Sequence, residues 1–95
     1  MRIDQFLKLS RVVKRRALAK EMCDKGMVKV NGKPVKASRE LSVGDEVEVD
    51  TLTRYFKFKV LEIPTGKNVS KKKAKELIQV IEDRKKDIRE IIDLI

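Results

Sequence analysis

A chain of 95 residues, of which 41% are apolar and 41% charged, has room for one small domain with a densely charged surface. The net charge of +9, from 24 basic and 15 acidic residues, favours a polyanionic partner, and nucleic acid before an anionic membrane. Because the chain has no histidine and a single cysteine, it excludes an intrachain disulfide and a thiolate zinc site, and we expect no cofactor and no enzymatic activity.

The excess positive charge is concentrated in the first third of the chain. Residues 1–36 contain eleven basic and three acidic residues, whereas residues 37–69 contain five and six, and residues 70–95 contain eight and six. An even spread of charge would be typical of a surface that only keeps the protein soluble, so this concentration predicts one binding face.

The sequence has no long apolar run and no signal-peptide layout at its start, and the apolar surroundings of Cys23 suit a buried thiol, so we expect a cytoplasmic protein.

Two short helices are predicted at the start of the chain. Apolar residues recur in the first at i, i+3 and i+4, and these are Ile3, Phe6 and Leu7. The second is expected from about Lys14 to Lys25, where the same spacing is found for Ala19, Met22 and Cys23. Asp4 would lie in the first turn of the first helix, where the helix dipole favours a carboxylate. Gly26 stands where a left-handed residue would end the second helix.

After Gly26 the apolar period changes to two, which predicts a small antiparallel sheet. Asn31-Gly32 indicates a two-residue hairpin between a first strand, which contains Val28 and Val30, and a return strand that begins at Val35. Two further strands are expected from the alternating apolar residues Val47, Val49, Phe56, Phe58 and Val60. This alternation assigns both phenylalanines to the core and turns Tyr55 to the other face.

A long amphipathic helix is expected from Lys71 to Ile95, with Ser70 as its N-cap. Its apolar stripe would consist of Ala74, Leu77, Ile78, Ile81, Ile88, Ile91, Ile92 and Ile95. Packing of the stripe within the chain is favoured over a surface for a partner or a second copy. The four lysines between positions 71 and 75 could contact an anion or simply aid solubility. The sequence therefore predicts an α+β domain: two N-terminal helices on a small antiparallel sheet, followed by a long C-terminal helix.

Several of these residues together resemble the alpha-L RNA-binding domain first described in the ribosomal protein S-four. The resemblance covers roughly residues 1–50 and is carried by Arg2-Ile3-Asp4, Arg16, Ala19, the Gly-x-Val-x-Val-Asn-Gly run at 26–32, and Gly44-Asp45. The run at 26–32 is its most specific part, because spacing and residue types agree together. The resemblance implies an RNA-binding domain over residues 1–63, with a loop and the amphipathic helix over residues 64–95.

The opening of the chain, up to Lys20, is similar to bacterial stand-alone members of this family. These include the ribosome-associated quality-control P-site tRNA factors and the fifteen-kilodalton heat-shock proteins. The similarity implies binding to a large ribosomal subunit that carries a stalled peptidyl-tRNA, with its rRNA and the tRNA as partners. For the quality-control factors it also implies a partner protein that elongates the blocked nascent chain. A heat-shock-type recycling role and a general rRNA or tRNA module are the alternatives, and no membrane partner is implied.

Eight residues are candidates for the RNA contact: Arg2, Asp4, Lys8, Arg11, Lys14, Arg15, Arg16 and Lys20. Arginine offers a bidentate fork and lysine a mobile point charge to phosphate. The resemblance singles out Arg2, Asp4 and Arg16, and we hypothesise that Asp4 orients a neighbouring arginine instead of meeting phosphate. Because only Tyr55 is left for base stacking, structured RNA is the expected target. A helix-turn-helix-like DNA module and a membrane-binding C-terminal helix are rival hypotheses.

Overall fold

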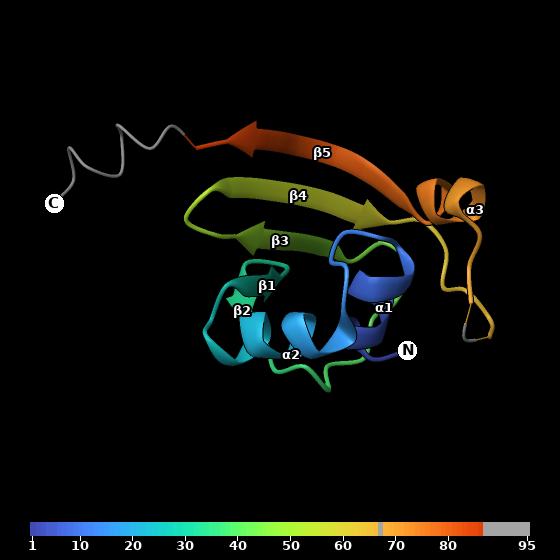
Figure 1. Cartoon of the computed structure of the whole chain (residues 1–95), viewed down its shortest axis with the longest axis horizontal. Helices are drawn as coiled ribbons and strands as arrows, with labels where there is room; N and C mark the ends of the chain where they lie inside the picture. The colour runs from blue at the N-terminus through green and yellow to red at the C-terminus, as the bar shows by residue number, and fades with distance from the viewer. Residues whose placement is uncertain (67, 87–95) are drawn as a thin grey trace, which may run out of the picture.

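An antiparallel sheet with two helices against one of its faces forms the body of the protein (Figure 1). The computed structural model describes residues 1–66 and 68–86. The helices are α1 (Ile3–Leu9), α2 (Arg16–Asp24) and the short α3 (Lys71–Glu76). The strands are β1 (Val28–Val30), β2 (Lys33–Pro34), β3 (Glu46–Asp50), β4 (Arg54–Val60) and β5 (Ile78–Lys85). In the order β2-β1-β3-β4-β5, every neighbouring pair is antiparallel, which confirms the predicted α+β class.

The predicted hairpin at Asn31-Gly32 is confirmed. Both residues have positive φ angles, 51° and 86°, as a two-residue turn of this kind requires. Lys33 pairs with Val30, so the return strand β2 begins two residues before the expected Val35. The Asn31 side chain also holds the second turn: its Oδ1 accepts from the N–H of Glu46 at 3.0 Å, and its Nδ2 donates to Asp45 Oδ1 at 3.2 Å. Asn31, in the most specific part of the sequence motif, therefore has a structural role, because its side chain links the end of β1 to the start of β3.

The core lies between the sheet and the pair α1 and α2. Its largest fully buried side chains are Phe6, Phe58, Ile3, Leu7, Leu77, Val28, Val47 and Val60. Phe56 is buried beside Phe58, as the alternation predicts, and the Phe6 and Phe58 rings stack with their centroids 6.1 Å apart. Cys23 is also buried, and desolvation raises the pKa of its thiol to about 11. The thiol therefore stays protonated at neutral pH, as expected for a structural cysteine.

The predicted helix from Lys71 to Ile95 is wrong over Ile78–Lys85. Ser70 does cap a helix, because its Oγ accepts from the N–H of Lys73 at 3.1 Å, but that helix is only the six residues of α3. Ile78–Lys85 instead forms β5, which pairs along the whole of β4 with a bulge between Lys57 and Phe58. Residues 87–95, which include Ile88, Ile91, Ile92 and Ile95, lie outside the described residues.

One local feature and one distant contact explain why the helical pattern was misleading. Ile78, Val80 and Ile81 are β-branched, so they suit a strand at least as well as a helix. The second feature is a pairing partner distant in sequence: β4 would otherwise expose a seven-residue edge, and β5 covers it. Packing within the chain is confirmed for Ala74, Leu77 and Ile78, whereas Ile81 is 48% exposed.

The strand β5 also removes support from the hypothesis of a membrane-binding C-terminal helix, because that hypothesis depended on a continuous helix over residues 71–95. No helix in the described part of the chain is long and apolar enough to span a bilayer. The strand β5, in addition, carries acidic and basic residues in equal measure over its last four positions, 82–85.

Candidate nucleic-acid interface

A buried carboxylate and two arginines form the centre of the basic face. Asp4, in the first turn of α1, is only 3% exposed. Its Oδ1 lies 3.4 Å from Nε of Arg2, and its Oδ2 lies 3.3 Å from Nε of Arg16. The side chains of Arg2 and Arg16 are 44% and 46% exposed, so each guanidinium retains surface for a second anion. We refer to these three residues as the Asp4 cluster.

Backbone contacts at the start of the chain hold the Asp4 cluster in place. Arg2 is extended and forms an isolated antiparallel bridge with Glu40, while the N–H of Ile3 donates to the carbonyl of Arg39 at 2.8 Å. The Asp4 carboxylate accepts from the N–H of Gln5 at 2.8 Å, which fixes its orientation. Arg16 is the first residue of α2, and α2 packs on α1. The cluster therefore joins two helices and the sheet-side loop before β3.

Helical spacing extends the cluster along both helices. Lys8 lies four residues after Asp4 on α1, and Lys20 lies four residues after Arg16 on α2, so each shares the face of its predecessor. Both lysines are exposed. Lys20 and Arg2 also line a cavity of about 370 Å³ together with Lys36 of the loop between β2 and β3. Lys36 was not singled out from the sequence, because only the fold brings that loop beside α2.

The other three candidates lie in the connection between α1 and α2. Arg11 and Lys14 are exposed and line a second cavity, of about 350 Å³, together with Lys8. Arg15 is the N-cap residue of α2, but its side chain does not cap the helix, which begins at Arg16 instead of the expected Lys14. Arg15 is exposed, and no described ion pair or cavity joins it to the other seven candidates.

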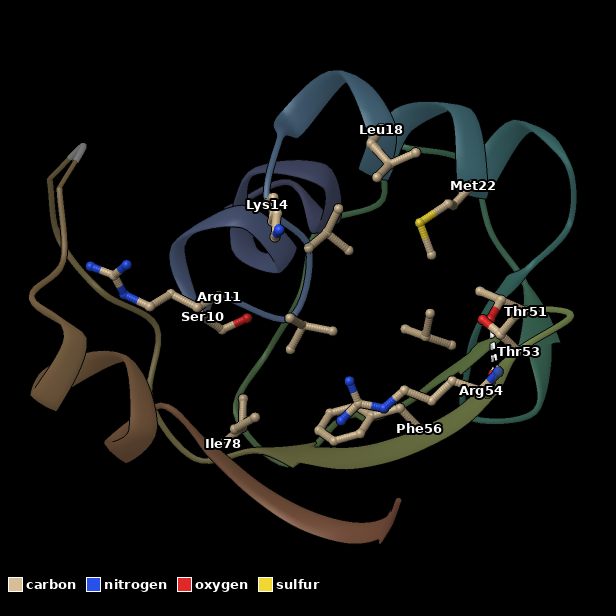
Figure 2. Close-up of a pocket in the computed structure, with 13 residues that line it drawn as sticks. Ser10, Arg11, Lys14, Leu18, Met22, Thr51, Thr53, Arg54, Phe56 and Ile78 are labelled. Atoms are coloured by element: carbon tan, nitrogen blue, oxygen red, sulfur yellow. Dashed lines mark hydrogen bonds between the residues drawn. The ribbon is translucent and has the colours of Figure 1, made fainter. Parts of the chain in front are cut away.

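A third cavity, of about 410 Å³, opens between the helices and the sheet (Figure 2). Its walls include apolar side chains from α2 and the sheet, such as Leu18, Met22 and Phe56. Arg54 reaches into it, but its guanidinium donates to both carboxylate oxygens of Asp83 at 2.8 Å and stacks 4.8 Å from the Phe56 ring centroid. Arg11 and Lys14 also line this cavity, but more than half of its lining residues are apolar, so it is less suited to phosphate than the Asp4 cluster.

The outer face of the sheet offers no open aromatic platform. Tyr55 is half-buried there, its hydroxyl donates to Glu48 at 3.0 Å, and Arg84 covers its ring at 5.8 Å from the centroid. Desolvation and the hydrogen bond to the Glu48 carboxylate raise the pKa of Tyr55 to about 12. Among residues 1–66 and 68–86, no group of three or more Cys, Asp or Glu side chains is arranged to hold a metal ion. The geometry thus favours backbone recognition over base stacking.

Comparisons with known proteins identify the family of the chain. The sequence model of the S4 domain matches residues 1–47, the segment that contains α1, α2 and the Asp4 cluster. An RQC P-site tRNA stabilizing factor of Helicobacter pylori (strain ATCC 700392 / 26695) is 44% identical over 72 residues, which cover 76% of this chain and 86% of that protein. The chain belongs to the RQC P-site tRNA stabilizing factor family.

A second member of the family and a solved structure complete the comparison. The factor of Streptococcus pneumoniae (strain ATCC BAA-255 / R6) is 49% identical over 63 residues, which cover 66% of this chain and 72% of that protein. The trimeric structure of Vibrio cholerae Heat Shock Protein 15 superposes with a TM-score of 0.75 at 23% identity, over 84% of this chain and 80% of that one. At that identity the likeness concerns the fold alone, which this family member shares with the heat-shock protein.

Proposed function

We propose that this member of the family binds RNA of the large ribosomal subunit through the Asp4 cluster and its flanking lysines. We propose further that it contacts a peptidyl-tRNA in the P site, in ribosome-associated quality control of stalled nascent chains in the cytoplasm. The names of its relatives, RQC P-site tRNA stabilizing factors, support this function. A protein that elongates the nascent chain is the proposed further partner.

The observation that carries the proposal is the pair of half-exposed arginines held by one buried carboxylate. A free arginine loses side-chain entropy when it binds phosphate, whereas Arg2 and Arg16 are already oriented by Asp4 at 3.4 and 3.3 Å. Two preordered guanidinium groups, one from the residue before α1 and one from the first residue of α2, can each present a fork to a phosphate. Such a rigid pair suits the regular backbone of a folded RNA better than a flexible single strand.

Co-sedimentation through a sucrose gradient tests the proposal. Purified large subunits are mixed with the protein, with and without peptidyl-tRNA in the P site, at moderate salt. We expect the protein to travel with the subunits and to bind more tightly when peptidyl-tRNA is present. If peptidyl-tRNA does not change the affinity for the subunit, the protein is a general rRNA-binding module. No co-sedimentation at all would reject the ribosome as the target and direct attention to free RNA and duplex DNA.

Replacing Asp4 by asparagine separates orientation from charge. The change is isosteric and raises the net charge by one, so attraction to any RNA cannot fall for lack of positive charge. The two arginines lose their fixed anion, however, and we expect affinity for the large subunit to fall about tenfold, the scale of one charge-assisted hydrogen bond. Parallel titrations with the large subunit and with unstructured RNA measure the ratio of the two affinities.

The outcome for Asp4→Asn is informative only if the variant remains folded, which circular dichroism and a thermal melt establish. Affinity for unstructured RNA is expected to stay the same or increase slightly. If fold and large-subunit affinity are both unchanged, Asp4 does not act as a positioning residue for Arg2 and Arg16.

A further inference from the structure

The second cavity of the basic face has a wall that lies outside the N-terminal motif. Lys8, Arg11 and Lys14 line one side of this cavity, and Asn68 and Val69, from the segment before α3, line the other. We call this cavity the Asn68 notch. It is open to solvent, and its volume is about 350 Å³. A segment nearly sixty residues away in sequence thus meets the connection between α1 and α2.

Arg11 joins the two walls of the notch. Its Nη2 donates to the carbonyl oxygen of Val69 at 3.4 Å, and in Figure 2 its side chain extends from the connection toward the segment that precedes α3. The backbone of Arg11 has a φ of 63°, in the left-handed region that residues other than glycine and asparagine rarely adopt. The Cβ of any residue other than glycine is disfavoured at such a φ, and backbone of this kind is retained where the surrounding structure or a binding role requires it.

The donors around the notch match the needs of a phosphodiester. Three cations lie along one side of a small opening, and Asn68 on the other side contributes a neutral amide. Beyond Val69, the exposed lysines Lys71, Lys72 and Lys75 take part in none of the described ion pairs. Lys73, by contrast, is engaged by Glu62 at 2.6 Å and by Glu76 at 3.5 Å. Positive charge therefore continues from the notch onto α3.

We propose that the Asn68 notch is a second phosphate-binding position, at which Asn68 and the cations Lys8, Arg11 and Lys14 hold an RNA backbone phosphate. This inference rests on the proposed function, since the RNA is the one that the Asp4 cluster engages. The site extends the RNA surface beyond the motif, and Lys71 and Lys72 continue it along the same strand of RNA. The cluster of lysines on α3 is then part of a binding surface and not only a solubility device.

Two amide-to-acid substitutions, matched in charge, test the notch. Asn68→Asp places a carboxylate in the notch, whereas Gln79→Glu makes the same change on β5, opposite Lys59. Both positions are exposed, so neither change is expected to unfold the protein. Affinity for the large subunit is measured at several salt concentrations. The logarithm of the association constant falls linearly with the logarithm of the salt concentration, and losing one phosphate contact should make that slope less steep by about one.

We expect Asn68→Asp to weaken binding about five- to tenfold and to reduce the slope by about one, while Gln79→Glu stays within about twofold of the wild type. Asn68→Ala, which removes the amide without adding charge, should weaken binding about two- to threefold and leave the slope unchanged. If the wild type binds and Asn68→Asp behaves like Gln79→Glu, the notch proposal is overturned and the proposed function stands. A wild type that fails to bind the large subunit overturns both.

Discussion

Arg16→Ala is expected to weaken binding to the large ribosomal subunit by about 10- to 100-fold, which corresponds to one or two charge-assisted contacts to phosphate. The loss should exceed that of any single lysine on the face, because the Arg16 guanidinium is oriented by Asp4 before RNA arrives. Arg16→Lys retains the charge but not the planar fork, so we expect an intermediate loss. Equilibrium titration of labelled protein with large subunits gives all three affinities.

The matched control for this change is Arg84→Ala. Arg84 is also an exposed arginine, but it lies on the outer face of the sheet, where it covers the Tyr55 ring. The two alanine variants have the same net charge, so a difference between them reports position and not total charge. Equal affinities for Arg16→Ala and Arg84→Ala would contradict the assignment of the binding face to α1 and α2.

Phe58→Ala is expected to lower the free energy of unfolding by about 3–5 kcal/mol. Phe58 is fully buried on β4, with the rings of Phe6 and Phe56 at centroid distances of 6.1 and 5.7 Å. Its loss would leave a cavity that rigid strands on either side cannot close. Because a domain of this size has only about 5–15 kcal/mol of stability in total, much of it should be lost. Urea denaturation followed by circular dichroism measures the change.

Two neighbouring substitutions calibrate the Phe58 result. Lys59→Ala, one position along β4 on the outer face, should change the free energy of unfolding by less than about 0.5 kcal/mol. Phe58→Leu retains much of the buried volume and should cost clearly less than alanine. A loss below about 1.5 kcal/mol for Phe58→Ala would show that the core does not depend on the contact between α1 and β4.

The parts of the fold that depend on local signals could be predicted from the sequence. The helical spacing of Ile3, Phe6 and Leu7 and the Asn31-Gly32 turn are each read within a few residues, and both were confirmed. The strand β5 could not be predicted in this way, because its partner β4 lies about twenty residues earlier and its apolar residues also fit a helix. Local spacing alone does not reveal which distant edge a β-branched segment will cover.

The same distinction applies to the candidate site. Arg2, Asp4 and Arg16 were predicted together, and the structure places both arginines within ion-pair distance of Asp4. Lys36 and Asn68 lack any motif of their own, and only the folded chain brings them beside Lys20 and Arg11. Positions contributed by loops are therefore the part of this interface that sequence reading misses.

The unequal lengths of the two outermost strands determine where the sheet is vulnerable to aggregation. At one edge β2 has only two residues, and Pro34 has no N–H to donate, so a further strand gains little there. At the other edge β5 has eight residues, but Glu82, Asp83, Arg84 and Lys85 present charges that an incoming strand would have to match. The aggregation-prone part of the sheet is thus the short apolar stretch of β5 around Val80 and Ile81, which are 52% and 48% exposed. Misassembly of partly folded chains should begin at that stretch.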